Sequence, residues 1–259
     1  MSPRILGVIA AALVALIVLS RAQRQDAPAA TVINADTDAL VTAGAPTQGA
    51  VARGPDSIGT PSIDLLARLA IRRRLERDRG RVYLDSLLLQ TDSTLVRWPD
   101  RADKTIRIAL VADTTVPGFT PALLDHARAG MAAWQSNEAG LQLREVDDPL
   151  TADIRVEWVT MLPDSAQLGL TEISWEGNGS ANRARIQLAL RTNPDSQVVP
   201  AAIARRVAAH EFGHALGLPH SPVDTDLMFP SSPVAAPSRR DQATLLLLYA
   251  VPSGPLKDP

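Results

Sequence analysis

One short segment constrains the fold of this chain more than any other. It runs from His210 to His220 and reads His-Glu-Phe-Gly-His-Ala-Leu-Gly-Leu-Pro-His. His210 and His214 are four residues apart, so on a helix their Cβ atoms lie about 6 Å apart on one face. We predict that this helix begins at Pro200, which suits a first turn. It should end at Gly217, because a glycine takes the positive φ angle that closes many helices.

The same residues have the chemistry of a catalytic zinc site. Two imidazoles on one helical face can reach a single tetrahedral ion at about 2.0–2.1 Å. Gly217 lets the chain reverse so that His220 supplies a third ligand, and the fourth position stays open for water. Glu211 points partly around the helix and can accept a proton from that water as general base. The alternative is a buried helix with hydrogen-bonded histidines, but three of the four histidines of the chain fall in this segment.

The residues after His220 continue a known pattern. Ser221 follows directly, and Leu227-Met228-Phe229-Pro230 places a methionine eight residues after His220. Together with the zinc motif, this arrangement resembles the metzincin peptidases of the matrixin branch, the matrix metalloproteinase-like enzymes. Looser similarities are a helix with Trp134, a strand start at 152–154 and a closing helix at 239–250.

For this chain the resemblance implies one catalytic zinc ion and a set of roles. The zinc ligands would be His210, His214 and His220, and the catalytic base would be Glu211. Met228 would lie beneath the metal as part of a Met-turn. The chain departs from the family in that it has no cysteine that could ligate the zinc in a latent form.

Residues around this centre also receive roles from the resemblance. Phe229 and Pro230 would wall the pocket for the residue after the scissile bond. Asp241 would brace the Met-turn, and its spacing from Ser238 fits a helix-capping pair. Asp153 matches a position that can bind calcium in such enzymes, so calcium is a further expected ion. The histidines of a second, structural zinc site are missing, since only four histidines are present.

Composition limits the other classes of function. Hydrophobic residues make up 46% of the 259 residues and aromatic residues only 3%, which predicts a largely aliphatic core. The formal charge of −2 argues against nucleic acid as a partner. The absence of cysteine excludes disulfides and thiolate metal sites. We expect a monomeric chain whose partner is a peptide or protein substrate.

The N-terminal residues have the pattern of an export segment. Arg4 precedes an uncharged apolar run at 5–19, and small residues follow at Ser20 and Ala22. Residues 1–22 are therefore predicted to be a cleaved signal peptide or a membrane anchor, and both alternatives stay open. Either one makes the protein extracytoplasmic: secreted, periplasmic or anchored to the membrane.

The remaining chain divides into four predicted segments. They are a flexible linker at 23–61, an accessory helical segment or cleft-blocking pro-segment at 62–98, a catalytic domain at 99–251 and a tail at 252–259. Within the catalytic domain, strand patterns occur at 105–111, 141–146, 152–159, 168–175 and 185–190. We predict an α/β (α+β) fold: a twisted mixed five-stranded sheet with two long helices, then a small C-terminal subdomain with the Met-turn and the closing helix.

These features predict a zinc-dependent endopeptidase. An extended peptide would pair with the edge strand around 169–173, because a free strand edge presents unpaired amides. One alternative is a non-proteolytic zinc hydrolase with the same site. Another is an inactive zinc-stabilised binding module, against which Glu211 argues, because a structural metal site needs no general base.

Overall fold

The computed structural model describes residues 42–43, 63–100, 104–164 and 167–257 of the chain. The predicted export segment at 1–22 lies outside these residues, as does the linker at 23–61 apart from residues 42 and 43. Within the described part of the chain, no helix combines the length and the apolar character needed to cross a membrane.

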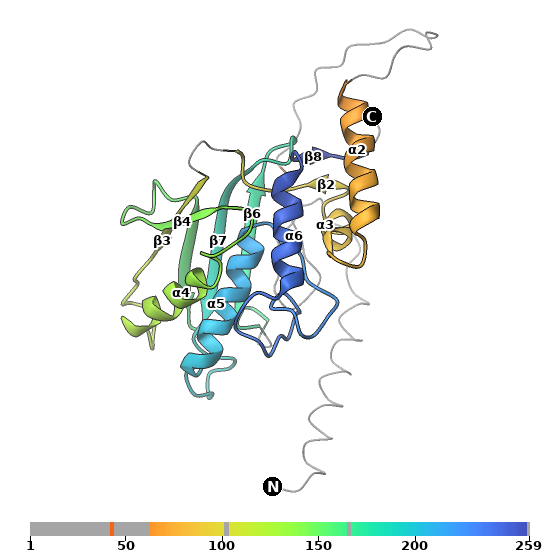
Figure 1. The fold of residues 1–259 in the computed structure, drawn as a ribbon. Coiled ribbons are helices and arrows are strands. Elements are labelled where there is room, and N and C mark those ends of the chain that lie inside the picture. The colour runs from red at the N-terminus through yellow and green to blue at the C-terminus, as the bar shows by residue number, and fades with distance from the viewer. Residues whose placement is uncertain (1–41, 44–62, 101–103, 165–166, 258–259) are drawn as a thin grey trace, which may run out of the picture.

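A mixed β-sheet forms the centre of the fold, as predicted (Figure 1). Its strands lie in the order β1-β6-β7-β5-β3-β4. The five predicted strands are β3 (Thr105–Leu110), β4 (Gln142–Glu145), β5 (Ile154–Val159), β6 (Gly169–Trp175) and β7 (Ala181–Ala189). Neighbours among them are parallel except for β6, which is antiparallel to β7. A two-residue strand, β1 (Thr42–Ala43), pairs in parallel with the end of β6.

Side-chain alternation gives the sheet one apolar and one polar face. In β5, Ile154, Val156 and Trp158 are buried, and the residues between them are half-buried. The opposite face carries ion pairs between strands, such as Arg185 Nε to Glu157 Oε2 at 3.0 Å. The apolar face is the one that helices must cover.

Two helices, α4 (Ala122–Ala132) and α5 (Ala201–Ala215), pack closely together on the sheet (Figure 1). A Cβ atom on Gly130 of α4 would lie 2.7 Å from the backbone of Ala208 and Ala209 in α5. The indole Nε1 of Trp134 donates a hydrogen bond to the carbonyl oxygen of Ala209 at 2.8 Å. These contacts fix the position of α5, which ends before Gly217 at φ 96°, as the motif predicts.

The chain after Gly217 forms the small C-terminal subdomain, which closes with α6 (Arg239–Ala250). The predicted cap is confirmed: the Ser238 hydroxyl accepts from the Asp241 amide, and the Asp241 carboxylate accepts from the Ser238 amide at 2.7 Å. The bounds of α6 are those of the predicted closing helix.

The segment before the sheet packs against this subdomain. It contains α2 (Ile63–Asp78), α3 (Leu84–Gln90) and β2 (Thr94–Leu95), which pairs antiparallel with β8 (Gly254–Pro255) in the predicted tail. Figure 1 shows α2 and α3 on the α6 side of the molecule. A second aliphatic cluster joins them, formed by Ile71, Leu75, Leu84, Leu87, Leu95, Leu247, Leu248, Val251 and Leu256.

Candidate active site

The three histidines of the motif come together at the second half of α5. His210, His214 and His220 each offer one ring nitrogen, and these three atoms lie within 4.8 Å of one another. The Nε2 atoms of His210 and His214 are 3.1 Å apart. The rings of His210 and His214 are buried, and that of His220 is half-buried. A group with this spacing can hold a metal ion.

Backbone carbonyl groups orient the two helical histidines. Nδ1 of His210 lies 2.7 Å from the carbonyl oxygen of Leu227, and Nδ1 of His214 lies 2.8 Å from that of Leu218. A carbonyl oxygen can only accept, so each Nδ1 carries the hydrogen and donates it. Burial lowers the pKa of His210 to about 4, although its bond to Leu227 acts in the opposite direction. Burial also lowers the pKa of His214 well below its usual value.

The resulting arrangement fits a bound metal ion. With neutral rings and the hydrogens on Nδ1, the Nε2 lone pairs of His210 and His214 face each other at 3.1 Å. Two such lone pairs repel unless a cation lies between them. In metal-binding histidines, the ring nitrogen that does not bind the metal usually donates its hydrogen to a backbone carbonyl or a carboxylate. Three imidazole nitrogens suit zinc, which prefers nitrogen and sulfur ligands.

Glu211 lies in contact with strand β6 and is only 1% exposed. Its Oε2 accepts a hydrogen bond from the Thr171 hydroxyl at 2.6 Å. Its Oε1 lies so close to the strand that a Cβ atom on Gly169 would be 2.3 Å away. Neither Gly169 nor Thr171 is recognisable from the sequence as a neighbour of Glu211. Alternation along a strand places residues two apart on one face, but it does not tell which helix that face meets.

Met228 packs against α5 near the helical histidines. A Cβ atom on Gly213, three residues after His210, would lie 2.2 Å from Met228 Sδ. The preceding residue, Leu227, donates its amide hydrogen to Asp241 Oδ2 at 2.9 Å, while its carbonyl oxygen accepts from His210. The predicted contact between Asp241 and this turn is therefore present. It links the histidine group to the start of α6.

A buried carboxylate that was not predicted from the sequence holds the turn before Met228. Asp226 is 3% exposed and accepts from the hydroxyl groups of Ser221 and Ser238 at 2.5 and 2.6 Å. The amide of Ser221 donates to the carbonyl oxygen of Met228 at 2.8 Å. Ser221 thus has a structural role, since it ties the residue after His220 to the turn.

Three further residues were given roles from the sequence: Phe229, Pro230 and Asp153. Phe229 and Pro230 follow Met228 and are half-buried. Asp153, the expected calcium position, is buried and binds Arg107, whose backbone amide and guanidinium NH2 donate to it at 2.8 and 3.0 Å. That ion pair joins the residue before β5 to β3 and gives the buried Asp153 carboxylate a cationic partner.

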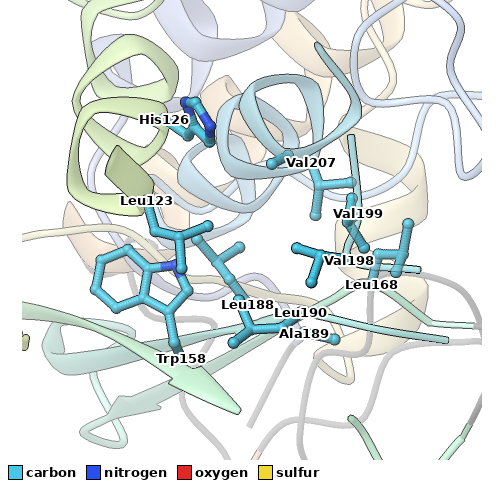
Figure 2. Close-up of a pocket in the computed structure, with 11 residues that line it drawn as sticks. Leu123, His126, Trp158, Leu168, Leu188, Ala189, Leu190, Val198, Val199 and Val207 are labelled. Atoms are coloured by element: carbon cyan, nitrogen blue, oxygen red, sulfur yellow. The ribbon is translucent and has the colours of Figure 1, made fainter. Parts of the chain in front are cut away.

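The fourth histidine lines an apolar pocket elsewhere on the domain. His126 of α4 is half-buried and shares this pocket with Leu123, Trp158, Leu188 and Val207 (Figure 2). The lining residues come from α4, β5, β7, the first half of α5 and the loops beside them, and none belongs to the histidine group. His126 therefore packs at the boundary of an apolar pocket.

Comparison with known proteins agrees with this geometry. A family model described as matrixin matches residues 101–244, which is more than half of the 259 residues. The matched region contains the five-stranded part of the sheet, α4, α5, the histidine group and the capped start of α6. No curated protein matches the chain closely enough to count as a relative. The chain therefore belongs to the matrixin family.

Proposed function

We propose that this protein is a zinc-dependent endopeptidase. The matrixin family implies a zinc peptidase, and one observation carries the proposal for this chain: two buried imidazoles present their Nε2 atoms 3.1 Å apart next to a buried glutamate. His210, His214 and His220 would hold one zinc ion. When bound, the zinc would act as a Lewis acid that makes a water molecule more acidic and polarises the scissile carbonyl. Met228 would support the site from beneath.

Glu211 is the residue that we assign to proton transfer. Its carboxylate would accept a proton from the attacking water and then pass that proton to the leaving amine. The carboxylate is already held in place by the Thr171 hydroxyl, at 2.6 Å from Oε2. A base that is fixed in this way does not have to find its orientation during the reaction.

The substrate would bind as an extended peptide along β6. On one side β6 pairs with β7; on the other, within the residues that the structure describes, β1 pairs with Ser174 and Trp175. The amides and carbonyls at Gly169–Ile173 therefore lie where a further strand can pair. Phe229 and Pro230 would form a wall of the pocket for the residue after the scissile bond, which favours a medium-sized apolar side chain there.

We further propose that the protein acts outside the cytoplasm as a monomer, in line with the predicted export segment at 1–22. Calcium binding at Asp153 stays a prediction, and it requires Arg107 to share or leave that carboxylate. Neither proposal alters the chemistry assigned to Glu211.

The decisive experiment is incubation of the purified chain with a diverse peptide library, with and without a zinc chelator. We expect cleavage of internal peptide bonds that stops on chelation and returns with added zinc. Glu211→Gln should keep its zinc and lose about 10²- to 10⁴-fold in turnover, the usual contribution of a general base. The exposed Glu138→Gln is the matched control and should leave turnover unchanged.

Other outcomes identify the alternatives. Turnover of small esters without peptide cleavage would indicate a non-proteolytic zinc hydrolase. Bound zinc without any turnover would indicate a binding module. Near-normal activity of Glu211→Gln would show that the base is misassigned.

A further inference from the structure

We propose that Thr171 is a positioning residue for Glu211: its hydroxyl holds the carboxylate in the orientation in which the carboxylate accepts a proton. This inference rests on the proposed function of Glu211 as general base. It adds a residue of the sheet to a site that otherwise comes from α5 and the segment after it.

The hydrogen bond from Thr171 to Glu211 is short and enclosed. The exposed fractions of Thr171 and Glu211 are 0% and 1%. Oγ1 of Thr171 lies 2.6 Å from Glu211 Oε2 and 3.2 Å from the backbone carbonyl oxygen of Glu211. A hydroxyl has one hydrogen to donate, and the carboxylate oxygen is both nearer and charged. Hydrogen bonds to charged acceptors are about twice as strong as those between neutral groups.

Gly169 provides the space that the same carboxylate occupies. It lies two residues before Thr171 and therefore on the same face of β6. A Cβ atom at Gly169 would lie 2.3 Å from Glu211 Oε1 and 2.6 Å from both Cγ and Cδ. Strand β6 thus leaves room for the Glu211 side chain at Gly169 and donates a hydrogen bond to its carboxylate from Thr171. The Glu211 carboxylate is positioned against the strand along which the peptide is proposed to bind.

A purely structural role for Thr171 makes a different prediction. If the threonine only fills space, its methyl group matters, because removal of buried methyl groups destabilises a core. If it positions Glu211, its hydroxyl matters. Thr171→Val keeps the branched shape and removes the hydroxyl, whereas Thr171→Ser keeps the hydroxyl and removes the methyl group.

The test compares kcat, KM, zinc content and thermal stability for these two variants. We expect Thr171→Val to lower kcat roughly ten- to hundredfold, the size associated with loss of a hydrogen bond to a charged group, with KM and zinc content unchanged. Thr171→Ser should keep kcat close to that of the unmodified protein. Gly169→Ala, which keeps the hydroxyl but displaces the carboxylate, should also lower kcat without loss of zinc.

Three results would overturn the inference. They are normal kcat in folded Thr171→Val, an equal loss of kcat in Thr171→Ser, and a further loss when Thr171→Val is added to Glu211→Gln. If Thr171→Val does not fold, Thr171→Ser and Gly169→Ala still decide the question. Failure of the proposed function gives a different result whatever happens at Thr171: either Glu211→Gln remains active, or the unmodified chain itself shows no peptide turnover.

Discussion

At the residue scale, main-chain carbonyl oxygens orient the two helical histidines, His210 and His214. The carbonyls of Leu218 and Leu227 each accept from an Nδ1, and both residues lie in the chain that follows the helix. Gly217, at φ 96°, is what allows this chain to fold back under α5. The turn therefore has two effects: it brings His220 to the group, and it brings the acceptor that fixes His214.

His220 is the ligand whose removal tests the set most directly. His220→Ala should lose its zinc on extensive dialysis, because two ligands on one helix do not complete a site that needs three. The matched control is His126→Ala, which changes the one histidine outside the motif and should retain one zinc per chain. Elemental analysis of both variants gives the result, and circular dichroism shows whether the fold is kept. Undiminished zinc in His220→Ala, or two zinc ions in the unmodified chain, would contradict the proposed ligands.

The sequence predicted the histidines at this scale but not the residues that hold them. Spacing of four on a helix is a property of side-chain types, so His210 and His214 could be recognised. Leu218 and Leu227 contribute only carbonyl oxygens, which every residue has, so no residue type marks them. Thr171 and Asp226 are marked by type, but Glu211 lies 40 residues from Thr171 in sequence, and Asp226 has partners both 5 and 12 residues away. Such partners are known only once strands and helices are placed.

At the scale of elements, helix α5 is in contact with a helix, a strand and a turn that together set its position. It contacts α4 through Gly130, β6 through Glu211, and the Met228 turn through Gly213. A glycine lies at each of these three contacts: Gly130, Gly169 and Gly213. A Cβ atom added to any of them would lie 2.7 Å or less from an atom of the neighbouring element. The position of the helix, and with it of both ligating rings, is therefore set by close packing.

Gly130→Ala tests this packing. Replacement of glycine by alanine within a helix usually stabilises by about 0.5–1 kcal/mol. Here the new Cβ would lie 2.7 Å from backbone atoms of Ala208 and Ala209, which cannot rotate away. We expect the sign to reverse, with a cost of about 1–3 kcal/mol and a Tm lowered by roughly 2–12 °C. Gly177→Ala, in the β6–β7 turn with nothing within 4 Å, is the control and should leave Tm unchanged. An unchanged or higher Tm for Gly130→Ala would mean that the helices separate easily.

Helices and strands could be predicted from the sequence where their pattern is local. The pairing of the strands in the sheet could not. The bounds of α6 and the five strand positions follow from capping residues and β-branched runs. β7 begins at Ala181 rather than at the predicted 185, because its first residues are held by pairing with β6 across the turn. The order β6-β7-β5-β3-β4 depends on contacts between distant segments, and so does the short strand β1 beside β6.

At the scale of the whole molecule, the domain extends beyond the region that the family model matches. The match covers 101–244, but the segment before it is tied to the segment after it. The Tyr83 hydroxyl donates to Asp241 Oδ1 at 2.6 Å, and Arg97 Nε donates to the carbonyl oxygen of Val251 at 2.9 Å. Burial raises the pKa of Tyr83 well above its usual value, which keeps the phenol protonated as a donor. Asp241, which receives this bond, also holds the amide of Leu227.

From these contacts we propose that 62–98 is an accessory segment rather than a removable pro-segment. Trp98 also supports this assignment, because its indole Nε1 donates a hydrogen bond of 2.8 Å to the carbonyl oxygen of Ala215 at the end of α5. Removal of the segment would uncover Leu247, Leu248 and Val251 and would take the Tyr83 hydroxyl away from Asp241, which would keep the amides of Leu227 and Ser238 as donors. A pro-segment would instead be expected to leave an intact enzyme behind.

Truncation separates the two alternatives. A chain that begins at residue 63 loses the short strand β1 but keeps α2 and α3, so it should still unfold cooperatively. A chain that begins at residue 99 should lose cooperative unfolding and aggregate. Tyr83→Phe isolates one contact: it should cost about 1.5–3 kcal/mol, because the acceptor is a buried carboxylate. Tyr249→Phe, which removes a 3.0 Å bond to the neutral carbonyl of Leu216, is the matched control and should cost only about 0.5–1.5 kcal/mol. A stable 99–259 chain with higher peptidase activity than the whole chain would instead identify 62–98 as a pro-segment, because release of a blocked cleft raises activity while loss of a structural layer cannot.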